Sequence, residues 1–298
     1  MIYAGIEAGG TKFVCGIGNH EGEVLDRVVI PTREPGKTIA EVVDYFTEIK
    51  KTQDIRGVGL ASFGPLDLDP TSSTYGFITS TPKRGWQYFD ITGELEKALG
   101  CTIPVDTDVN AAALAEYKWG AARGKKNVVY LTIGTGIGGG ALVNGHLIHG
   151  LLHPEMGHVR IRADGLDVSD KGICPFHEYC LEGLASGPAM QARWSILPQE
   201  IPPDHPAWKL EAQFLAEGLT NIILILSPNI IILGGGIMSQ ESLFPLVRER
   251  VVNLLNGYIQ HPDILENIDE YIIPPELGDN AGLLGAVALA LGHSENGS

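Results

Sequence analysis

The chain has 298 residues, of which 44% are hydrophobic and 19% charged, a composition typical of folded globular proteins and not of disordered ones. One typical core does not support a chain of this length, so two domains are expected. The net charge of −15 argues against nucleic acid as a partner, because phosphates would be repelled. No run approaches 18 uncharged apolar residues, so neither a membrane span nor a membrane partner is expected.

The first residues, MIYAGIEAGGTK, hold a short apolar run and a Gly-rich turn with no basic segment before them. This pattern predicts a strand entering a turn and not a signal peptide, so a cytoplasmic location is expected. The four cysteines are too few and too scattered for a disulfide framework. Cys15 and Cys101 lie in or beside apolar segments, which predicts buried thiols.

Apolar periodicity and turn residues predict the elements of the first half of the chain. Strands at Ile2–Ile6 and Phe13–Ile17 flank the turn Glu7-Ala-Gly-Gly-Thr-Lys12 and form a hairpin. The elements predicted after it are a strand at Val24–Ile30, a helix at Thr38–Lys50, a strand at Ile55–Ala61, an irregular loop over residues 66–90, a helix at Ile91–Leu99, a strand at Ile103–Thr107 and a helix at Ala111–Trp119. Asp108 or Asn110 is the expected N-cap of the last helix.

The second half opens in the same way, with a strand at Val128–Ile133, a glycine-rich turn over residues 134–140 and a return strand starting at Ala141–Val143. The elements predicted after it are a helix at Pro206–Leu226, a strand at Ile230–Leu233, a helix at Leu243–Leu255, a strand at Tyr271–Ile273 and a helix at Ala281–Leu291. Two halves with the same opening predict a duplicated α/β architecture with a site between two domains. The boundary is expected near residues 116–127.

Two apparent nucleotide motifs fail on their context. Residues 134–139 fit G-x-G-x-x-G, but that fingerprint requires a helix after the turn, and here a strand is predicted. Gly36-Lys37-Thr38 resembles the end of a P-loop, but Pro31 stands where the first glycine is required. Neither match therefore predicts a nucleotide-binding motif of the Rossmann or P-loop type.

The glycine turns still favour a phosphate-binding role. Glycine lets backbone N–H groups converge on phosphate oxygens, although each hairpin taken alone is also explained as a tight turn. Hydroxyls at Thr11 and Thr135, the ammonium of Lys12 and a third glycine cluster at residues 234–236 favour a nucleotide held between two domains.

The stretch from His153 to Glu182 combines metal ligands with acids. Nitrogen and sulfur ligands of the kind that tetrahedral Zn²⁺ takes are supplied by His158, Cys174, His177 and Cys180. Carboxylates that accept hydroxyl protons recognise sugars, and Glu155 and Glu182 lie at the edges of this segment. The pattern predicts a zinc-stapled loop that holds an acid and a histidine over a substrate pocket.

Two other carboxylates stand at strand ends. Asp108 lies between a strand end and a helix start, which suits a catalytic carboxylate, and N-capping is the alternative interpretation. The two roles could also be divided, with Asn110 or Thr107 as the cap and Asp108 facing the cleft. Glu7 precedes the first glycine turn and could reach a Mg²⁺ held by nucleotide phosphates, or be a solvated charge.

Taken together, these motifs resemble the ROK family, which groups repressors, open reading frames and sugar kinases. The resemblance covers nearly the whole chain and rests on five motifs in family order: Glu7-Ala-Gly-Gly-Thr-Lys12, Asp108-Val-Asn-Ala-Ala-Ala-Leu-Ala-Glu116, Gly134-Thr-Gly-Ile-Gly138, Glu155-Met-Gly-His158 and Leu233-Gly-Gly-Gly236. Within the family, Glu-Ala-Gly-Gly-Thr-Lys-Phe and His-Pro-Glu-Met-Gly-His most resemble the bacterial zinc-containing fructokinases.

The resemblance implies a two-domain, duplicated actin-like ATPase (ribonuclease H-like) fold with an interdomain cleft. The expected domains are a small one over residues 1–117 with the C-terminal segment 280–298, and a larger one over 118–279 that carries the zinc loop. It also implies an ATP- and Mg²⁺-dependent sugar kinase with a structural Zn²⁺, and favours a homodimer.

The family's roles carry over by position. Asp108 would be the general base, and Asn110, Glu155, His158 and Glu182 would contact or shape the sugar site. The residues expected at ATP are Gly9, Gly10, Thr11, Lys12, Thr135, Gly136, Pro188, Gly234, Gly235 and Gly236. Zinc would be held by His158, Cys174, His177 and Cys180, and Glu7 would be a magnesium contact.

Two positions depart from the family pattern. Many members have Asp where this chain has Glu7, and many use Cys-x-Cys-Gly-x-x-Gly-Cys where this chain has Cys-x-x-His-x-x-Cys. The ligand count survives because His177 replaces a thiolate. The expected reaction is ATP-dependent phosphorylation of D-fructose to fructose 6-phosphate. The alternatives are another ROK hexose kinase, acting on glucose, mannose or N-acetylmannosamine, and a non-catalytic sugar-responsive regulator.

Overall fold

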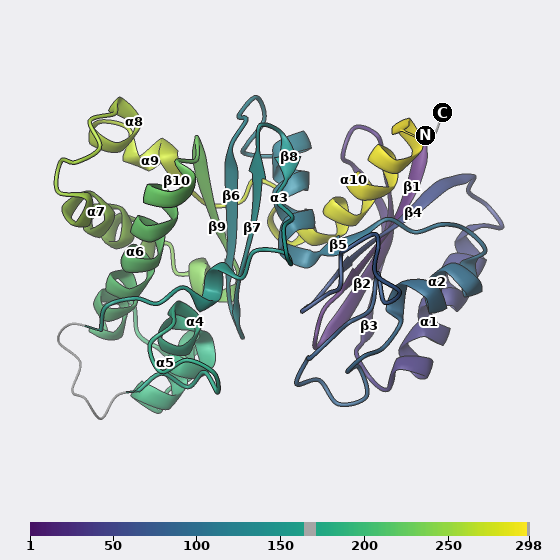
Figure 1. Ribbon diagram of the computed structural model, residues 1–298, viewed down its shortest axis with the longest axis horizontal. Coiled ribbons are helices and arrows are strands. Elements are labelled where there is room, and N and C mark those ends of the chain that lie inside the picture. The colour runs from purple at the N-terminus through teal and green to yellow at the C-terminus, as the bar shows by residue number, and fades with distance from the viewer. Residues whose placement is uncertain (164–170, 297–298) are drawn as a thin grey trace. The chain divides into compact units, whose positions relative to one another are not determined.

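The computed structural model describes residues 1–163 and 171–296, and its chain forms two compact units (Figure 1). Unit 1 comprises Met1–Gly124, His146–Pro154 and Glu276–Ser298, and unit 2 comprises Lys125–Gly145 and Glu155–Pro275. Residues 164–170 of the predicted zinc-bearing stretch and 297–298 of the predicted C-terminal segment lie outside the described residues. The predicted domain boundaries stay a prediction.

Unit 1 is built on a sheet in the order β3-β2-β1-β4-β5. Its strands are β1 (Ile2–Ala8), β2 (Lys12–Asn19), β3 (Val24–Pro31), β4 (Ile55–Ser62) and β5 (Val105–Thr107). The first three strands pair antiparallel, as expected for the predicted hairpin and its extension, whereas β4 runs parallel to β1 and β5 parallel to β4. The carboxyl ends of β1, β4 and β5 therefore meet at one edge.

Helices cover both faces of this sheet. The helices of unit 1 are α1 (Pro35–Ile49), α2 (Ile91–Leu99), α3 (Asp108–Trp119) and α10 (Ala281–Asn296). Ile6 of β1 belongs to the main core with Phe46 of α1 and Leu95 of α2, whereas Tyr3, an odd number of positions away on the same strand, packs with Val287 of α10. Since side chains alternate across a strand, α1 and α2 lie on the face opposite α10.

Glycines in the strands let α10 lie close to the sheet. A Cβ at Gly59 would stand 2.1 Å from the carbonyl oxygen of Ala286, and one at Gly5 would stand 2.7 Å from that of Leu283. These contacts are with backbone, which cannot move aside as a flexible side chain can. Any larger residue at either position would push α10 off the sheet.

Unit 2 repeats this topology. Its elements, together with the short strand that follows β7 in the chain, are β6 (Val128–Ile133), β7 (Ile137–Val143), β8 (His146–Leu147), α4 (Leu181–Ala185), α5 (Gly187–Trp194), α6 (Ala207–Leu226), β9 (Ile230–Gly234), α7 (Leu243–Leu255), α8 (Pro262–Leu265), α9 (Ile268–Tyr271) and β10 (Ile272–Ile273). The order β7-β6-β9-β10 corresponds to β2-β1-β4-β5, with an antiparallel hairpin followed by parallel strands in each case. The predicted duplication of an α/β architecture is confirmed.

The start of β7 and the helix α5 differ from the elements expected from the sequence. β7 begins at Ile137, inside the predicted turn, because its glycines accommodate a neighbouring segment: a Cβ at Gly139 would stand 2.7 Å from the Cβ of Met156. Among the expected N-caps of α3, Thr107 is the one observed, and its Oγ1 accepts a hydrogen bond from the Asn110 N–H at 3.1 Å. The short helix α5 was not predicted. Among the described residues, no helix has both the length and the apolar character that a membrane span requires.

Glu116, near the end of α3, is fully buried and binds three backbone N–H groups. Its Oε2 accepts from Ala121 at 2.8 Å and from Glu276 at 3.3 Å, and its Oε1 accepts from Leu277 at 2.9 Å. A buried carboxylate is stable only when such donors replace water. Gly120 is required beside it, because a Cβ there would stand 2.0 Å from Oε2.

Replacing Glu116 with glutamine should lower the free energy of unfolding by about 1–3 kcal/mol, because an amide N–H₂ would face backbone donors that it cannot satisfy. The measurement is urea unfolding followed by circular dichroism. Glu249→Gln, a change at an exposed position of α7, is the control and should leave stability nearly unchanged. Equal stabilities of the two variants would contradict the role assigned to Glu116.

Candidate functional site

The last residues of β1 place Glu7 against the start of α10. A Cβ at Gly282 of α10 would stand 2.3 Å from the Glu7 carboxyl carbon, so glycine is needed there. The Oε2 atom of Glu7 is buried and has no hydrogen-bond partner among the described residues. Burial and then the charge of Asp108 raise the pKa of Glu7 to about 7, although Lys12 opposes this shift. Glu7 and Asp108 are therefore electrostatically coupled across the end of the sheet.

Asp108 is the first residue of α3 and lies directly after β5. Because Thr107 caps the helix, the Asp108 carboxylate is not required as the cap. Its Oδ1 accepts a hydrogen bond from the Val109 N–H at 2.9 Å, and the residue is partly exposed. The positive end of the helix dipole stabilises a carboxylate at this position. Asp108 is thus a fixed, solvent-accessible negative charge.

A buried carboxylate that the sequence did not point to, Asp106, lies next to these groups. Its Oδ1 accepts hydrogen bonds from the Thr107 N–H at 2.7 Å and from Asn110 Nδ2 at 2.8 Å, and its Oδ2 lies 2.8 Å from His149 Nε2. Asn110 itself is fully buried. Sequence reasoning missed Asp106 and His149 because neither belongs to a recognisable motif.

The first glycine turn joins β1 to β2, and hydrogen bonds within the turn and from Thr32 hold it in place. The Gly9 N–H donates to the Lys12 carbonyl at 3.0 Å, and Thr32 Oγ1 donates to the Gly9 carbonyl at 2.7 Å. Gly10, Thr11 and Lys12 are exposed. The turn therefore presents backbone N–H groups, a hydroxyl and an ammonium to an incoming ligand.

Unit 2 contains a cavity of about 440 Å³ beside the second glycine turn. Three residues predicted to contact ATP, Thr135, Pro188 and Gly236, line it. The lining residues that the sequence did not reveal are Gly187, Gln191, Leu197, Pro198, Gln199 and Ile237, with Gly134 of the turn itself. Most of them lie on or after α5, so recognising Gly187-Pro188 as a helix start would have found them.

Hydrogen bonds from two helices hold this second turn. The Gly134 N–H donates to the Gly136 carbonyl at 2.9 Å, and the N–H of Gly187, at the start of α5, donates to the Gly134 carbonyl at 2.7 Å. Glu182 of α4 accepts the Ile137 N–H at 3.0 Å through Oε2, the same atom that a Cβ at Gly136 would approach to 2.8 Å. The position of the Glu182 carboxylate therefore requires a glycine at residue 136.

The predicted glycine triplet lies at the end of β9, and its last member, Gly236, lines the cavity, whereas Gly234 and Gly235 are not among the lining residues. Gly234 ends β9, and Gly235 has φ of 90°, a left-handed conformation that favours glycine. A Cβ at Gly235 would also stand 2.4 Å from the Ile133 carbonyl oxygen. Both constraints explain why the chain has glycine there.

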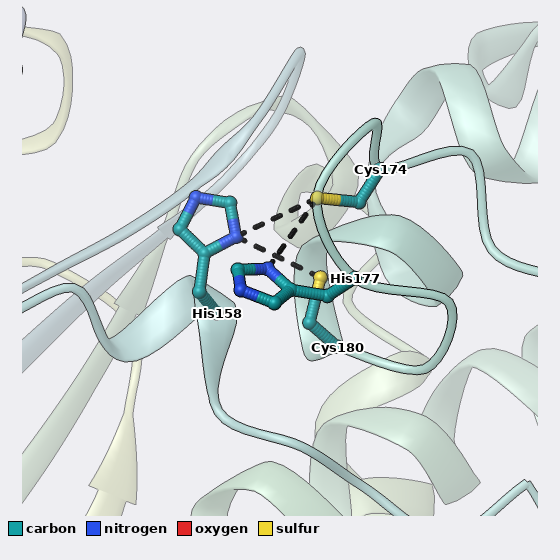
Figure 2. Close-up of side chains that lie close together, drawn as sticks. All are labelled: His158, Cys174, His177 and Cys180. Carbon is teal, nitrogen blue, oxygen red and sulfur yellow. Dashed lines mark hydrogen bonds between the residues drawn. The ribbon is translucent and has the colours of Figure 1, made fainter.

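Four predicted metal ligands come together in unit 2 (Figure 2). The ligand atoms of His158, Cys174, His177 and Cys180 all lie within 4.8 Å of one another. His158 Nδ1 is 3.8 Å from the Cys174 Sγ and 3.7 Å from the Cys180 Sγ, and His177 Nδ1 is 3.7 Å from the Cys174 Sγ. This cluster could hold a metal ion.

The two predicted sugar-contacting acids differ in their relation to this cluster. The Oε1 of Glu182 lies 3.9 Å from His158 Nε2, the ring nitrogen that does not face the cysteines. Glu155 is exposed and precedes the 3₁₀ turn Met156–His158, with its carbonyl accepting the His158 N–H at 3.0 Å. Glu182 thus contacts both the cluster and the glycine turn.

The chain resembles known proteins in both sequence and fold. The sequence pattern of the ROK family matches residues 3–293. The chain belongs to the ROK family. Its actin-like ATPase fold agrees with solved ROK structures: a ROK hexokinase from Thermus thermophilus, 28% identical, superposes with a TM-score of 0.81 over 99% of this chain and 100% of that one.

Other ROK proteins carry more specific names. A fructokinase from Pediococcus pentosaceus is 42% identical over 99% of this chain and 100% of its own length, and one from Lactococcus lactis is 43% identical over 94% and 93%. A ROK glucokinase from Streptomyces griseus, solved with glucose and AMPPNP, is 25% identical with a TM-score of 0.77 over 98% of this chain and 100% of that one.

Replacing Glu7 with glutamine should stabilise the metal-free protein at alkaline pH. The raised pKa means that the folded state resists ionisation, so stability falls between pH 4.5 and about 7 and then stays level. The free energy of unfolding of Glu7→Gln should therefore exceed that of the wild type by an amount that grows over this pH window. Since a shift of one pKa unit corresponds to about 1.36 kcal/mol, the difference should reach roughly 3 kcal/mol.

The measurement is urea unfolding at several pH values in the absence of magnesium. Glu21→Gln, in the exposed turn after β2, is the control and should show no such growth. A stability difference between wild type and Glu7→Gln that stays constant with pH would contradict the coupling of Glu7 to its buried environment.

Proposed function

We propose that the protein is a fructokinase that transfers the γ-phosphoryl group of ATP to D-fructose and yields fructose 6-phosphate. The observation that carries the proposal is the identity of 42–43% with fructokinases over nearly the full length of both chains. The accessible carboxylate of Asp108 at the start of α3, where the family resemblance puts the general base, agrees with it.

The cavity beside α5 supports an ATP site. Its apolar lining, with Leu197, Pro198 and Ile237, suits a flat nucleobase, and the amides of Gln191 and Gln199 can hydrogen-bond to its edge. The adjacent glycine turn, with Thr135 at the cavity, can donate N–H groups to phosphate oxygens. The turn at residues 9–12 would supply further donors and the charge of Lys12.

Phosphoryl transfer requires positioning and charge stabilisation more than covalent chemistry. Asp108 would orient the attacking sugar hydroxyl and take its proton as the new O–P bond forms. Asn110, Glu155, His158 and Glu182 would hold the other hydroxyls or shape their pocket. Mg²⁺ bound with ATP would neutralise phosphate charge, and Glu7 is the residue proposed to face it.

The Cys/His cluster fits zinc. In a tetrahedron, a zinc–sulfur bond of about 2.3 Å and a zinc–nitrogen bond of about 2.0–2.1 Å place nitrogen and sulfur roughly 3.6 Å apart. Three nitrogen–sulfur distances in the cluster, 3.7–3.8 Å, are close to this value, and all four ligand atoms lie within 4.8 Å of one another. Four protein ligands leave no open position, so the metal would be structural and would fix His158 and the neighbouring Glu182.

Changing Asp108 to asparagine should lower kcat by at least about 10²-fold, because the amide cannot take the hydroxyl proton. The KM values for fructose and ATP should change little, since the side chain keeps its size. ADP release with fructose measures both parameters. Asp44→Asn, at an exposed position of α1, is the control. Near-normal turnover of the Asp108 variant would remove Asp108 from the role of base.

A panel of hexoses in the same ADP-release assay tests the substrate. Fructose should give the highest kcat/KM, and glucose, mannose and N-acetylmannosamine lower values. A preference for one of those sugars would keep the kinase but overturn the assignment to fructose.

Protein purified without chelator should contain about one zinc per chain. Cys174→Ser should lose the metal, whereas Cys101→Ser, at a free cysteine of unit 1, should retain it. Elemental analysis measures this content. Zinc below about half an equivalent in fully active wild type would contradict the assignment of the cluster as a zinc site.

A further inference from the structure

Two glutamines line the cavity of unit 2, and no hydrogen bond holds their amides. Gln191 lies on α5 and Gln199 in the 3₁₀ turn Pro198–Glu200, and both residues are exposed. Neither side chain makes a hydrogen bond or ion pair with the part of the chain that the structure describes. Each amide can therefore rotate about its last single bond.

An amide that rotates can present either a donor or an acceptor at the same place. Its oxygen accepts hydrogen bonds, its nitrogen donates them, and the two ends are similar in size. Asn110 of unit 1 shows the contrast, because its buried amide nitrogen donates to Asp106 Oδ1 at 2.8 Å. No such partner restrains the two glutamines of the cavity.

The other groups of the lining have little capacity to read the edge of a base. Among the described residues, the lining has no charged side chain. The backbone carbonyls of four lining residues already accept hydrogen bonds at 2.7–3.3 Å from the residue three positions further on, namely those of Leu197, Pro198, Gly236 and Ile237. The apolar side chains contact the faces of a ring and select its shape. Reading of the edge is therefore left to the two glutamines.

Purine bases differ at the edge that these amides would meet. Adenine has a donor in its 6-amino group and an acceptor at N1, whereas hypoxanthine and guanine have an acceptor in the 6-oxo group and a donor at N1. A fixed donor or acceptor rejects the wrong base by about 10⁴-fold, because it is then left unpaired. A glutamine amide that rotates can pair with either edge.

We propose that the phosphoryl-donor site accepts purine nucleoside triphosphates as a class and uses ITP and GTP nearly as well as ATP. This inference rests on the proposed function, because it takes the cavity as the nucleobase site. The apolar walls select a flat double ring, and the glutamines adapt to its edge. Pyrimidine nucleotides are poorer donors, since a single ring covers less of the apolar lining.

The experiment measures kcat/KM for ATP, ITP, GTP and UTP at a saturating concentration of the hexose that the wild type phosphorylates best. Anion-exchange chromatography of nucleoside diphosphates and triphosphates measures turnover equally for every donor. The values for ITP and GTP should lie within about tenfold of that for ATP, far from the rejection that a fixed group would give. UTP should give a lower value than every purine nucleotide.

Replacing an amide with a carboxylate tests whether these glutamines meet the base. A carboxylate accepts hydrogen bonds but cannot donate them, so it pairs with the N1–H of hypoxanthine and not with N1 of adenine. In at least one of Gln191→Glu and Gln199→Glu, the ratio of kcat/KM for ITP to that for ATP should rise about tenfold or more. A general loss of nucleotide binding caused by the new charge cancels in this ratio. Gln53→Glu, at an exposed glutamine after α1 in unit 1, is the control and should keep the wild-type ratio.

The outcomes separate this inference from the proposed function. A wild type that phosphorylates no hexose with any of the nucleotides overturns the proposed function. An active wild type that uses ITP or GTP more than about tenfold less well than ATP overturns the inference. Use of UTP equal to that of the purine nucleotides also overturns it, because the cavity would then not select a double ring. An unchanged ratio of ITP to ATP in both glutamate variants has the same consequence, because neither amide would then read the base.

Discussion

The structure of unit 1 depends on one buried carboxylate. Glu116 binds the N–H groups of Ala121, Glu276 and Leu277, which lie beside the first and last of the places where the chain changes unit, after residue 124 and after residue 275. These segments have few regular hydrogen bonds of their own, so a side chain must satisfy them. Both segments are thereby fixed to the end of α3, and the second of them leads into α10. The strand glycines then allow it to pack against backbone.

In unit 2, Glu182 likewise joins two parts of the structure. One oxygen accepts the Ile137 N–H at the start of β7, and the other faces the ring of His158 in the Cys/His cluster. Through this single side chain, the order of the cluster reaches the glycine turn that borders the cavity. A metal ion held by the cluster would therefore also stabilise the glycine turn beside the cavity.

The sequence predicted some parts of this arrangement well and others poorly, for physical reasons. Helices α2 and α7 and strand β6 have the predicted bounds, because their apolar pattern and terminal residues act locally. The predicted start of β7 was wrong because Gly139 in this strand is required by its contact with Met156, which is distant in the sequence. The four metal ligands were found from spacing, whereas the pairing of Asp106 with His149 joins residues 43 positions apart and has no local signal.

Three consecutive residues, the last two of β5 and the first of α3, divide the structural tasks at the end of the strand. Asp106 binds Asn110 through one carboxylate oxygen and His149 through the other, and Thr107 caps α3. Because both structural needs are met by neighbours, Asp108 can remain partly exposed at the positive end of the helix. Asp108 Oδ1 still accepts the Val109 N–H at 2.9 Å, so the division relieves Asp108 of capping α3 but not of backbone contact. An acid that had to cap the helix as well would have more of its oxygen lone pairs bound by backbone N–H groups, which lowers the basicity of a carboxylate. Division of these tasks among adjacent side chains therefore agrees with the role of base proposed for Asp108.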